Sequence, residues 1–124
     1  MAKARPKHLD LRLIKLPIPA IVSIMHRVSG AGMFLMLPFV LWLLQSSLQS
    51  PTSYVHFTDT LAHPLVKLIL LGLLWAFLHH FCAGIRYLLL DLDKGGDLAT
   101  ARLTSWIVLA VSVVMTLFLG AKLW

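Results

Sequence analysis

The chain has 124 residues, of which 59% are hydrophobic and 13% charged, and its mean hydropathy is +0.85. Soluble domains usually carry about 25% charged residues, so this composition argues against a soluble domain and predicts a membrane protein. The net charge of +6 does not indicate nucleic-acid binding, because the basic residues cluster near predicted membrane ends, where anionic lipid attracts them. The single cysteine, Cys82, lies in an apolar segment and excludes a disulfide framework within the chain.

A basic segment, residues 1–19, precedes the first apolar stretch and is predicted to be a cytoplasmic tail. Its basic residues are Lys3, Arg5, Lys7, Arg12 and Lys15. Since this segment leads directly into a full-length apolar stretch, no cleavable signal peptide is expected.

The first predicted membrane span covers about residues 20–48, which is long enough to cross a hydrocarbon core of ~30 Å. Pro38 lies inside this span and is expected to kink the helix, which membrane helices tolerate where neighbours satisfy the freed carbonyl. The segment from residue 46 to residue 64 is predicted to be a loop, and it contains no lysine or arginine.

Two further spans are predicted, over about residues 65–90 and 103–123, so the fold class is an all-α membrane protein with one domain over 1–124. The loop between them, 91–102, contains Lys94 and Arg102 and is otherwise a turn rich in Asp and Gly. By the positive-inside rule, the N-terminus and this loop are expected in the cytoplasm and the C-terminus outside.

The second span contains an uninterrupted uncharged run, residues 68–85, that includes the adjacent pair His79 and His80. An intramembrane histidine is costly without a partner and is therefore a functional hypothesis. The residues that share a helical face with His80 are mostly small: Gly72, Ala76, Ala83, Gly84 and Tyr87. Such a strip permits close helix packing, or it leaves room for a flat macrocycle whose iron the imidazole reaches. His79 has the bulky Trp75 on its face.

A metal needs more than one ligand, and the other histidines offer no good second one. His8 is in the tail, His56 and His63 are in the predicted outer loop, and His26 is expected at a different depth from His80. If His80 ligates haem iron, the other axial ligand must come from another chain, which predicts a hetero-oligomer.

A second group of polar residues lies at the start of the first span. Ser23 and Arg27 are four positions apart and share a helix face. Arg27 can serve as an anchor for lipid phosphate, or the pair can donate hydrogen bonds to a carbonyl oxygen that gains electron density on reduction. His26 could donate to a carboxylate such as a haem propionate.

These motifs, taken in order, resemble one family, the cytochrome b membrane anchor subunit of succinate:quinone oxidoreductase (succinate dehydrogenase). The resemblance covers almost the whole chain and rests on Arg5-Pro6, Leu9-Asp10-Leu11, Ser23-Ile24, His26-Arg27, Ser29-Gly30, His80, Gly84-Ile85-Arg86 and Asp91. Length, number of spans and topology agree with it as well.

The resemblance implies a role for each matching residue. His80 matches the family's axial haem b ligand, Ser23 and Arg27 match positions that line the ubiquinone pocket, and His26 and Arg27 match positions close to the haem propionates. The chain departs from many members at Tyr87, where they have histidine after Gly-Ile-Arg. A tyrosine could still hydrogen-bond a propionate.

The resemblance also implies partners and a location. Succinate would be oxidised in a flavoprotein subunit, and electrons would pass through an iron–sulfur subunit to ubiquinone. Haem b would be shared with a second three-helix membrane anchor subunit. The expected location is the bacterial inner (cytoplasmic) membrane, with the basic tail under the soluble subunits.

Two other functional classes are alternatives to a haem-binding subunit. A haem-free structural anchor would use His80 only for a hydrogen bond to a neighbouring helix, and an optical spectrum distinguishes it. A transporter with a histidine proton relay would be expected to place carboxylates in its spans. Between Asp10 and Asp91 the chain has only the loop residue Asp59, which argues against a transporter.

Overall fold

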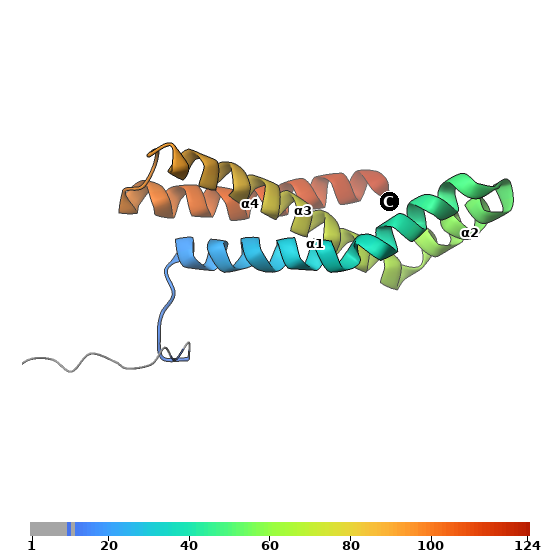
Figure 1. The fold of residues 1–124 in the computed structure, drawn as a ribbon, viewed down its shortest axis with the longest axis horizontal. Helices are drawn as coiled ribbons and strands as arrows, with labels where there is room; N and C mark the ends of the chain where they lie inside the picture. The colour runs from blue at the N-terminus through green and yellow to red at the C-terminus, as the bar shows by residue number, and fades with distance from the viewer. Residues whose placement is uncertain (1–9, 11) are drawn as a thin grey trace, which may run out of the picture.

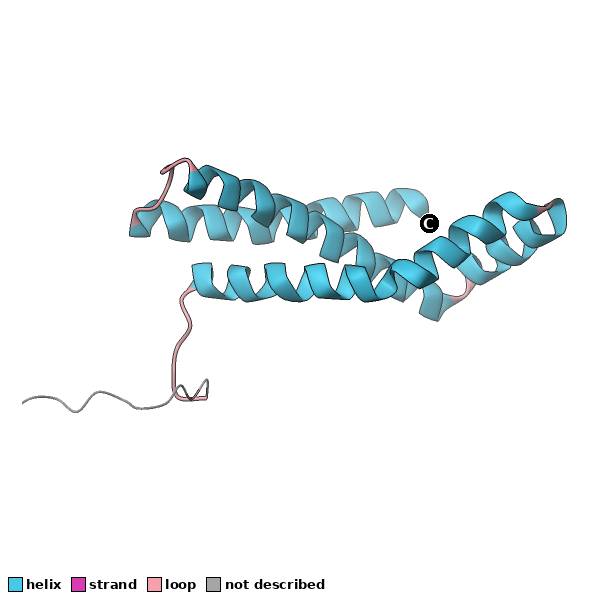
Figure 2. Cartoon of the chain, in the orientation of Figure 1, coloured by secondary structure: helices cyan, strands magenta, loops and turns pink. Residues whose placement is uncertain are grey.

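The computed structural model describes residue 10 and residues 12–124, and the regular structure in this part of the chain is helical. Its elements are α1 (Ile18–Gln49), α2 (Pro51–Ala62), α3 (Pro64–Asp91) and α4 (Leu98–Leu123) (Figures 1 and 2). By length and composition, α1, α3 and α4 can each cross a membrane. For the described residues, the prediction of an all-α fold with three helices able to span a membrane is therefore confirmed. Most of the predicted tail, residues 1–9 and 11, lies outside the described residues.

The three long helices lie side by side, and α3 packs against both α1 and α4 (Figure 1). The start of α1, the end of α3 and the start of α4 meet at one end of the bundle. Each long helix contributes one residue to a small buried core, made by Val22, Ala83 and Val108. Many large apolar side chains on the outer faces are exposed, as expected for helices whose neighbours are lipid tails or partner helices.

Helix α1 is longer than a span requires. Its 32 residues extend ~48 Å, against a hydrocarbon core of ~30 Å. The helix is continuous through Pro38, and Figure 1 shows its second half turning toward α2. Proline removes one backbone hydrogen bond and crowds the preceding turn, so Pro38 accounts for this change of direction.

The predicted loop over residues 46–64 is wrong, because most of it is helix α2. Ser50 caps this helix through a capping box with Ser53, and Pro51 occupies the first turn. His63 then caps α3, since its Nδ1 accepts a hydrogen bond from the Leu65 backbone N–H at 3.2 Å. A polar residue followed by proline is a helix-start signal, and both Ser50-Pro51 and His63-Pro64 carry it.

Helix α4 begins five residues before the predicted span at residue 103. The Asp97 carboxylate accepts a hydrogen bond from the Thr100 backbone N–H at 3.0 Å and so caps the helix. The turn before it contains Gly95 at φ +76°. Glycine adopts this left-handed conformation without a Cβ clash, which explains the tight reversal between α3 and α4.

Candidate functional site

The Ser23–Arg27 pair is confirmed as a contact on one face of α1. One terminal nitrogen of the Arg27 guanidinium donates to Ser23 Oγ at 3.4 Å. Arg27 is exposed and Ser23 is half-buried, so most donors of the guanidinium remain free toward the surroundings of the bundle. The pair lies near the end of the bundle where α1 begins.

The His80 ring is oriented by the backbone of α1. Its Nδ1 lies 2.9 Å from the His26 carbonyl oxygen and 3.3 Å from Ser29 Oγ. A carbonyl oxygen can only accept, so the hydrogen bond assigns the proton to Nδ1. The Nε2 of a neutral imidazole then keeps its lone pair, which is the atom and state that a metal requires.

Gly30 makes room for this ring. A Cβ atom at Gly30 would stand 2.8 Å from His80 Cε1, which is closer than real Cβ contacts. The Ser29-Gly30 pair and His80 are thus one packing unit, although they are about 50 residues apart in the sequence. Sequence reasoning noted Ser29-Gly30 only as part of a motif and missed its contact with His80.

The prediction that His26 lies at a different depth from His80 is wrong. The two imidazole rings stack in parallel, with centroids 4.0 Å apart and an interplanar angle of 11°. Helices α1 and α3 are antiparallel, and both residues lie in the parts of the helices nearest the same end of the bundle. Two rings stacked face to face leave no room for an iron atom between them, so His26 does not serve as the opposite axial ligand in this arrangement.

His79 differs from His80 in burial and in hydrogen bonding. It is fully buried and stacks on Trp75 at 5.2 Å, and neither of its ring nitrogens has a hydrogen-bond partner. The small residues predicted to share a face with His80 do not share one environment. Ala83 is fully buried in the core, while Gly72 has open space around it. A fully enclosed ring such as His79 cannot reach a large planar ligand.

Tyr87 lies beside His26, with ring centroids 5.1 Å apart in an edge-on arrangement. Its hydroxyl is buried and lacks a hydrogen-bond partner. The next residue back, Arg86, hydrogen-bonds to Thr104 on α4, and its guanidinium carbon lies 5.5 Å from the centre of the Tyr87 ring.

Among the described residues there is no group of three or more His, Cys, Asp or Glu side chains that could hold a bare metal ion. The arrangement around His80 offers one oriented imidazole nitrogen. A single protein ligand of this kind fits a metal that arrives with most of its coordination already filled, as in a macrocycle.

The family model described as the succinate dehydrogenase/fumarate reductase transmembrane subunit matches residues 1–119. The succinate dehydrogenase cytochrome b556 subunit of Coxiella burnetii is 35% identical over 125 residues, which covers 100% of both chains. The subunits of the same name from Rickettsia felis and Paracoccus denitrificans are 30% and 32% identical, over 93% and 90% of this chain and 90% and 85% of theirs.

Proposed function

The chain belongs to the family of succinate dehydrogenase/fumarate reductase transmembrane subunits and is a membrane subunit of such a complex, and from this premise we propose that it binds haem b through His80 and helps to form a ubiquinone site at Ser23 and Arg27. The relatives' name, cytochrome b556 subunit, supports the haem assignment.

The observation that carries the haem proposal is the hydrogen bond from His80 Nδ1 to the His26 carbonyl. It holds the imidazole in the tautomer whose Nε2 can ligate iron, and Gly30 leaves the ring room in that orientation. Bound haem b would supply a one-electron redox centre. His26 lies beside His80 and could hydrogen-bond a propionate. The Tyr87 hydroxyl is enclosed within the chain, so the structure does not present it to this group.

The second axial ligand comes from a partner in this proposal. His26 stacks on His80 and cannot oppose it, while His79 is enclosed in the bundle. The remaining described histidines lie at the other end of α3, since His56 is in α2 and His63 caps the start of α3. We therefore infer that a second membrane anchor subunit provides the ligand, and that the iron–sulfur and flavoprotein subunits complete the complex.

The quinone proposal rests on the exposed Arg27 and its contact with Ser23. Reduction increases the electron density on a quinone carbonyl oxygen, so a guanidinium and a hydroxyl that both donate to this oxygen favour the reduced form. Ser23 lies one helical turn from Arg27 toward the start of α1, which orders the two donors along the helix. Electrons would reach this site from the iron–sulfur subunit.

We also propose that the N-terminus and the α3–α4 loop face the cytoplasm, in a bacterial inner membrane. Five basic residues precede α1 in the sequence. Four more lie toward the end of the bundle where α1 and α4 start and α3 ends: Arg27, Arg86, Lys94 and Arg102. Lys67 and Lys122 are the exceptions. The positive-inside rule assigns this end to the cytoplasm. The same end then carries Arg27 and Ser23, where a soluble iron–sulfur subunit could dock.

The experiment compares two adjacent histidines in the purified complex. His80→Ala should remove or alter the low-spin b-type absorption spectrum, while His79→Leu should leave it unchanged. Both variants must still copurify with the flavoprotein, which controls for assembly. A wild-type spectrum in an assembled His80→Ala complex would contradict the proposed ligand.

A haem-free structural anchor is the second candidate. The packing of His80 against Gly30 and its hydrogen bond to His26 would suffice for a purely structural histidine. A purified wild-type complex without any b-type spectrum would favour this candidate over haem binding.

A further inference from the structure

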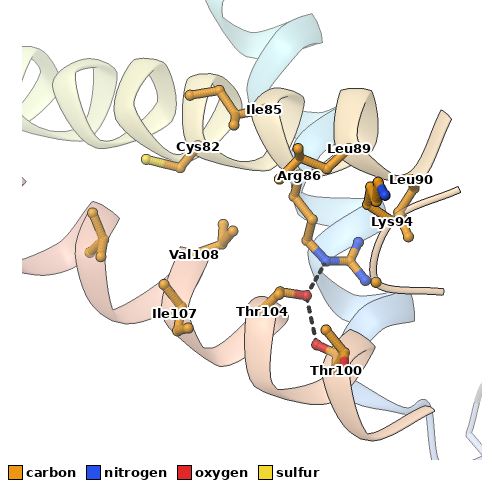
Figure 3. Close-up of a pocket in the computed structure, with 12 residues that line it drawn as sticks. Cys82, Ile85, Arg86, Leu89, Leu90, Lys94, Thr100, Thr104, Ile107 and Val108 are labelled. Carbon is orange, nitrogen blue, oxygen red and sulfur yellow. Dashed lines mark hydrogen bonds between the residues drawn. The ribbon is translucent and has the colours of Figure 1, made fainter. Parts of the chain in front are cut away.

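A groove between α3 and α4 carries a separate group of polar residues. It encloses a cavity of about 420 Å³ between the end of α3 and the first half of α4 (Figure 3). Its polar end is formed by Arg86, Lys94, Thr100 and Thr104, and the remaining walls are largely apolar. None of the residues proposed to bind haem or quinone lines this groove.

Arg86 is a buried, permanently charged group, and its hydrogen-bond partners among the described residues are neutral. The residue is 6% exposed, and its Nε donates to Thr104 Oγ1 at 3.0 Å (Figure 3). A terminal nitrogen donates to the Ala101 carbonyl at 3.4 Å. A guanidinium has five N–H donors, so several remain unused. Neither of its two acceptors is charged. A buried charge in a membrane span is costly unless an anion accompanies it.

The charge of the groove favours an anion from outside the chain. Lys94 adds a second positive charge at the same end, and no acidic residue is among those that line the groove. Of the three aspartates at the end of α3 and in the α3–α4 loop, Asp97 already caps α4 through Thr100. The other two, Asp91 and Asp93, are exposed and do not line the groove.

The apolar part of the groove is lined by side chains of α3 and α4 that continue from its polar end into the span. Leu89 and Ile107, on facing helices, are 48% and 50% exposed and so present apolar surface to whatever fills the groove. From Thr104 to Val111, which also lines it, α4 advances ~10 Å into the span. Arg86 lies five residues before the last residue of α3, which is the depth from which a long basic side chain reaches lipid headgroups.

We propose that this groove binds one anionic phospholipid, whose phosphate lies at Arg86 and Lys94 and whose acyl chain follows the apolar wall toward Val111. The two free oxygens of a phosphodiester suit the planar fork of a guanidinium, and Lys94 contributes a point charge. A zwitterionic lipid offers the same phosphate, but its own cation competes with both basic residues. The preference is therefore for a headgroup with net negative charge.

The test uses the complex purified from membranes and native mass spectrometry, with dioleoylphosphatidylglycerol or dioleoylphosphatidylcholine added as the probe. One phosphatidylglycerol molecule should bind in preference to phosphatidylcholine. Lys94→Gln should lower this binding about fivefold, as expected for one basic residue at a membrane surface. Arg86→Gln removes a charge-assisted donor and should lower it at least tenfold.

Arg102→Gln is the matched control, because it removes the same charge from an exposed position of α4 that does not line the groove. It should leave binding unchanged, and an equal loss in Lys94→Gln and Arg102→Gln would overturn the site. Equal binding of the two lipids would also overturn it. Lys94 is exposed, so its variant decides the matter even if Arg86→Gln fails to assemble.

A partner subunit is the competing occupant, and a crosslinker distinguishes it. Benzoylphenylalanine placed at position 107 in the assembled complex should form an adduct with phospholipid. An adduct with another protein chain in its place would show that a partner helix covers the groove and would overturn the proposal.

Discussion

Replacing Gly30 with alanine should disturb the haem site without removing any side chain proposed to bind haem. The new Cβ would stand 2.8 Å from His80 Cε1 and 3.2 Å from Nδ1. Ordinary contact begins at 3.4 Å, so the ring must retreat by about 0.6 Å or α1 and α3 must separate by a similar amount. Either movement takes His80 away from α1.

The movement acts on the hydrogen bond that orients the imidazole. The distance from Nδ1 to the His26 oxygen, 2.9 Å in the structure, would stretch to about 3.5 Å, beyond the usual range. A lost neutral hydrogen bond costs about 0.5–1.5 kcal/mol, which corresponds to a two- to tenfold loss of haem affinity. The basicity of Nε2 should fall as well, because the Nδ1 proton loses its acceptor.

The assay measures three properties of the purified complex: haem per flavin, the reduced absorption spectrum and the haem reduction potential. Gly30→Ala should lower the first and shift the other two. Gly32→Ala is the control, because a Cβ there meets nothing within 4 Å, so only the helix propensity of α1 changes. If Gly30→Ala matched Gly32→Ala and the wild type in all three properties, the assignment of His80 and its contact with α1 would be refuted.

Three further predictions concern the quinone site, the topology and His79. Arg27→Ala should slow quinone reduction by roughly one to two decades, since a charge-assisted donor contributes about 1.5–3 kcal/mol, and Ser23→Ala by roughly two- to tenfold, since a neutral hydroxyl contributes about 0.5–1.5 kcal/mol. Both variants should leave succinate oxidation with a soluble acceptor intact. Unchanged quinone kinetics in an assembled Arg27→Ala complex would leave Arg27 as a lipid anchor. A reporter active only in the cytoplasm should work when fused after Gly96 and fail when fused within residues 51–59, and the reverse result would invert the proposed topology. His79→Leu should retain or raise the Tm, because leucine has a similar volume and removes two ring nitrogens that lack hydrogen-bond partners. His79→Ala should lower the free energy of unfolding by about 2 kcal/mol or more, because it leaves a cavity. A lower Tm for His79→Leu than for His79→Ala would show that the ring nitrogens do have partners.

The sequence predicts the spans well because their signal is physical and local. A run of about 20 apolar residues has few alternatives to a spanning helix, and all three such runs are long helices in the structure. The Ser23–Arg27 contact was predictable for the same reason, since helical periodicity alone brings the two side chains together.

The remaining features depend on how the helices pack, which no single segment encodes. His26 was expected at another depth because the true start of α1 and the register between α1 and α3 were unknown. The contact between Gly30 and His80 needed both helices in place. By contrast, the start of α2 at Ser50-Pro51 and the Asp97 cap of α4 were readable from local signals that the prediction did not use.

The most direct test of the central claim is chemical rescue at His80. A His80→Gly complex, assembled with its flavoprotein, should lack the low-spin b-type spectrum and should recover it when millimolar imidazole replaces the missing ring. A wild-type spectrum in His80→Gly before any imidazole is added would show that the iron takes its ligand elsewhere and would contradict the account.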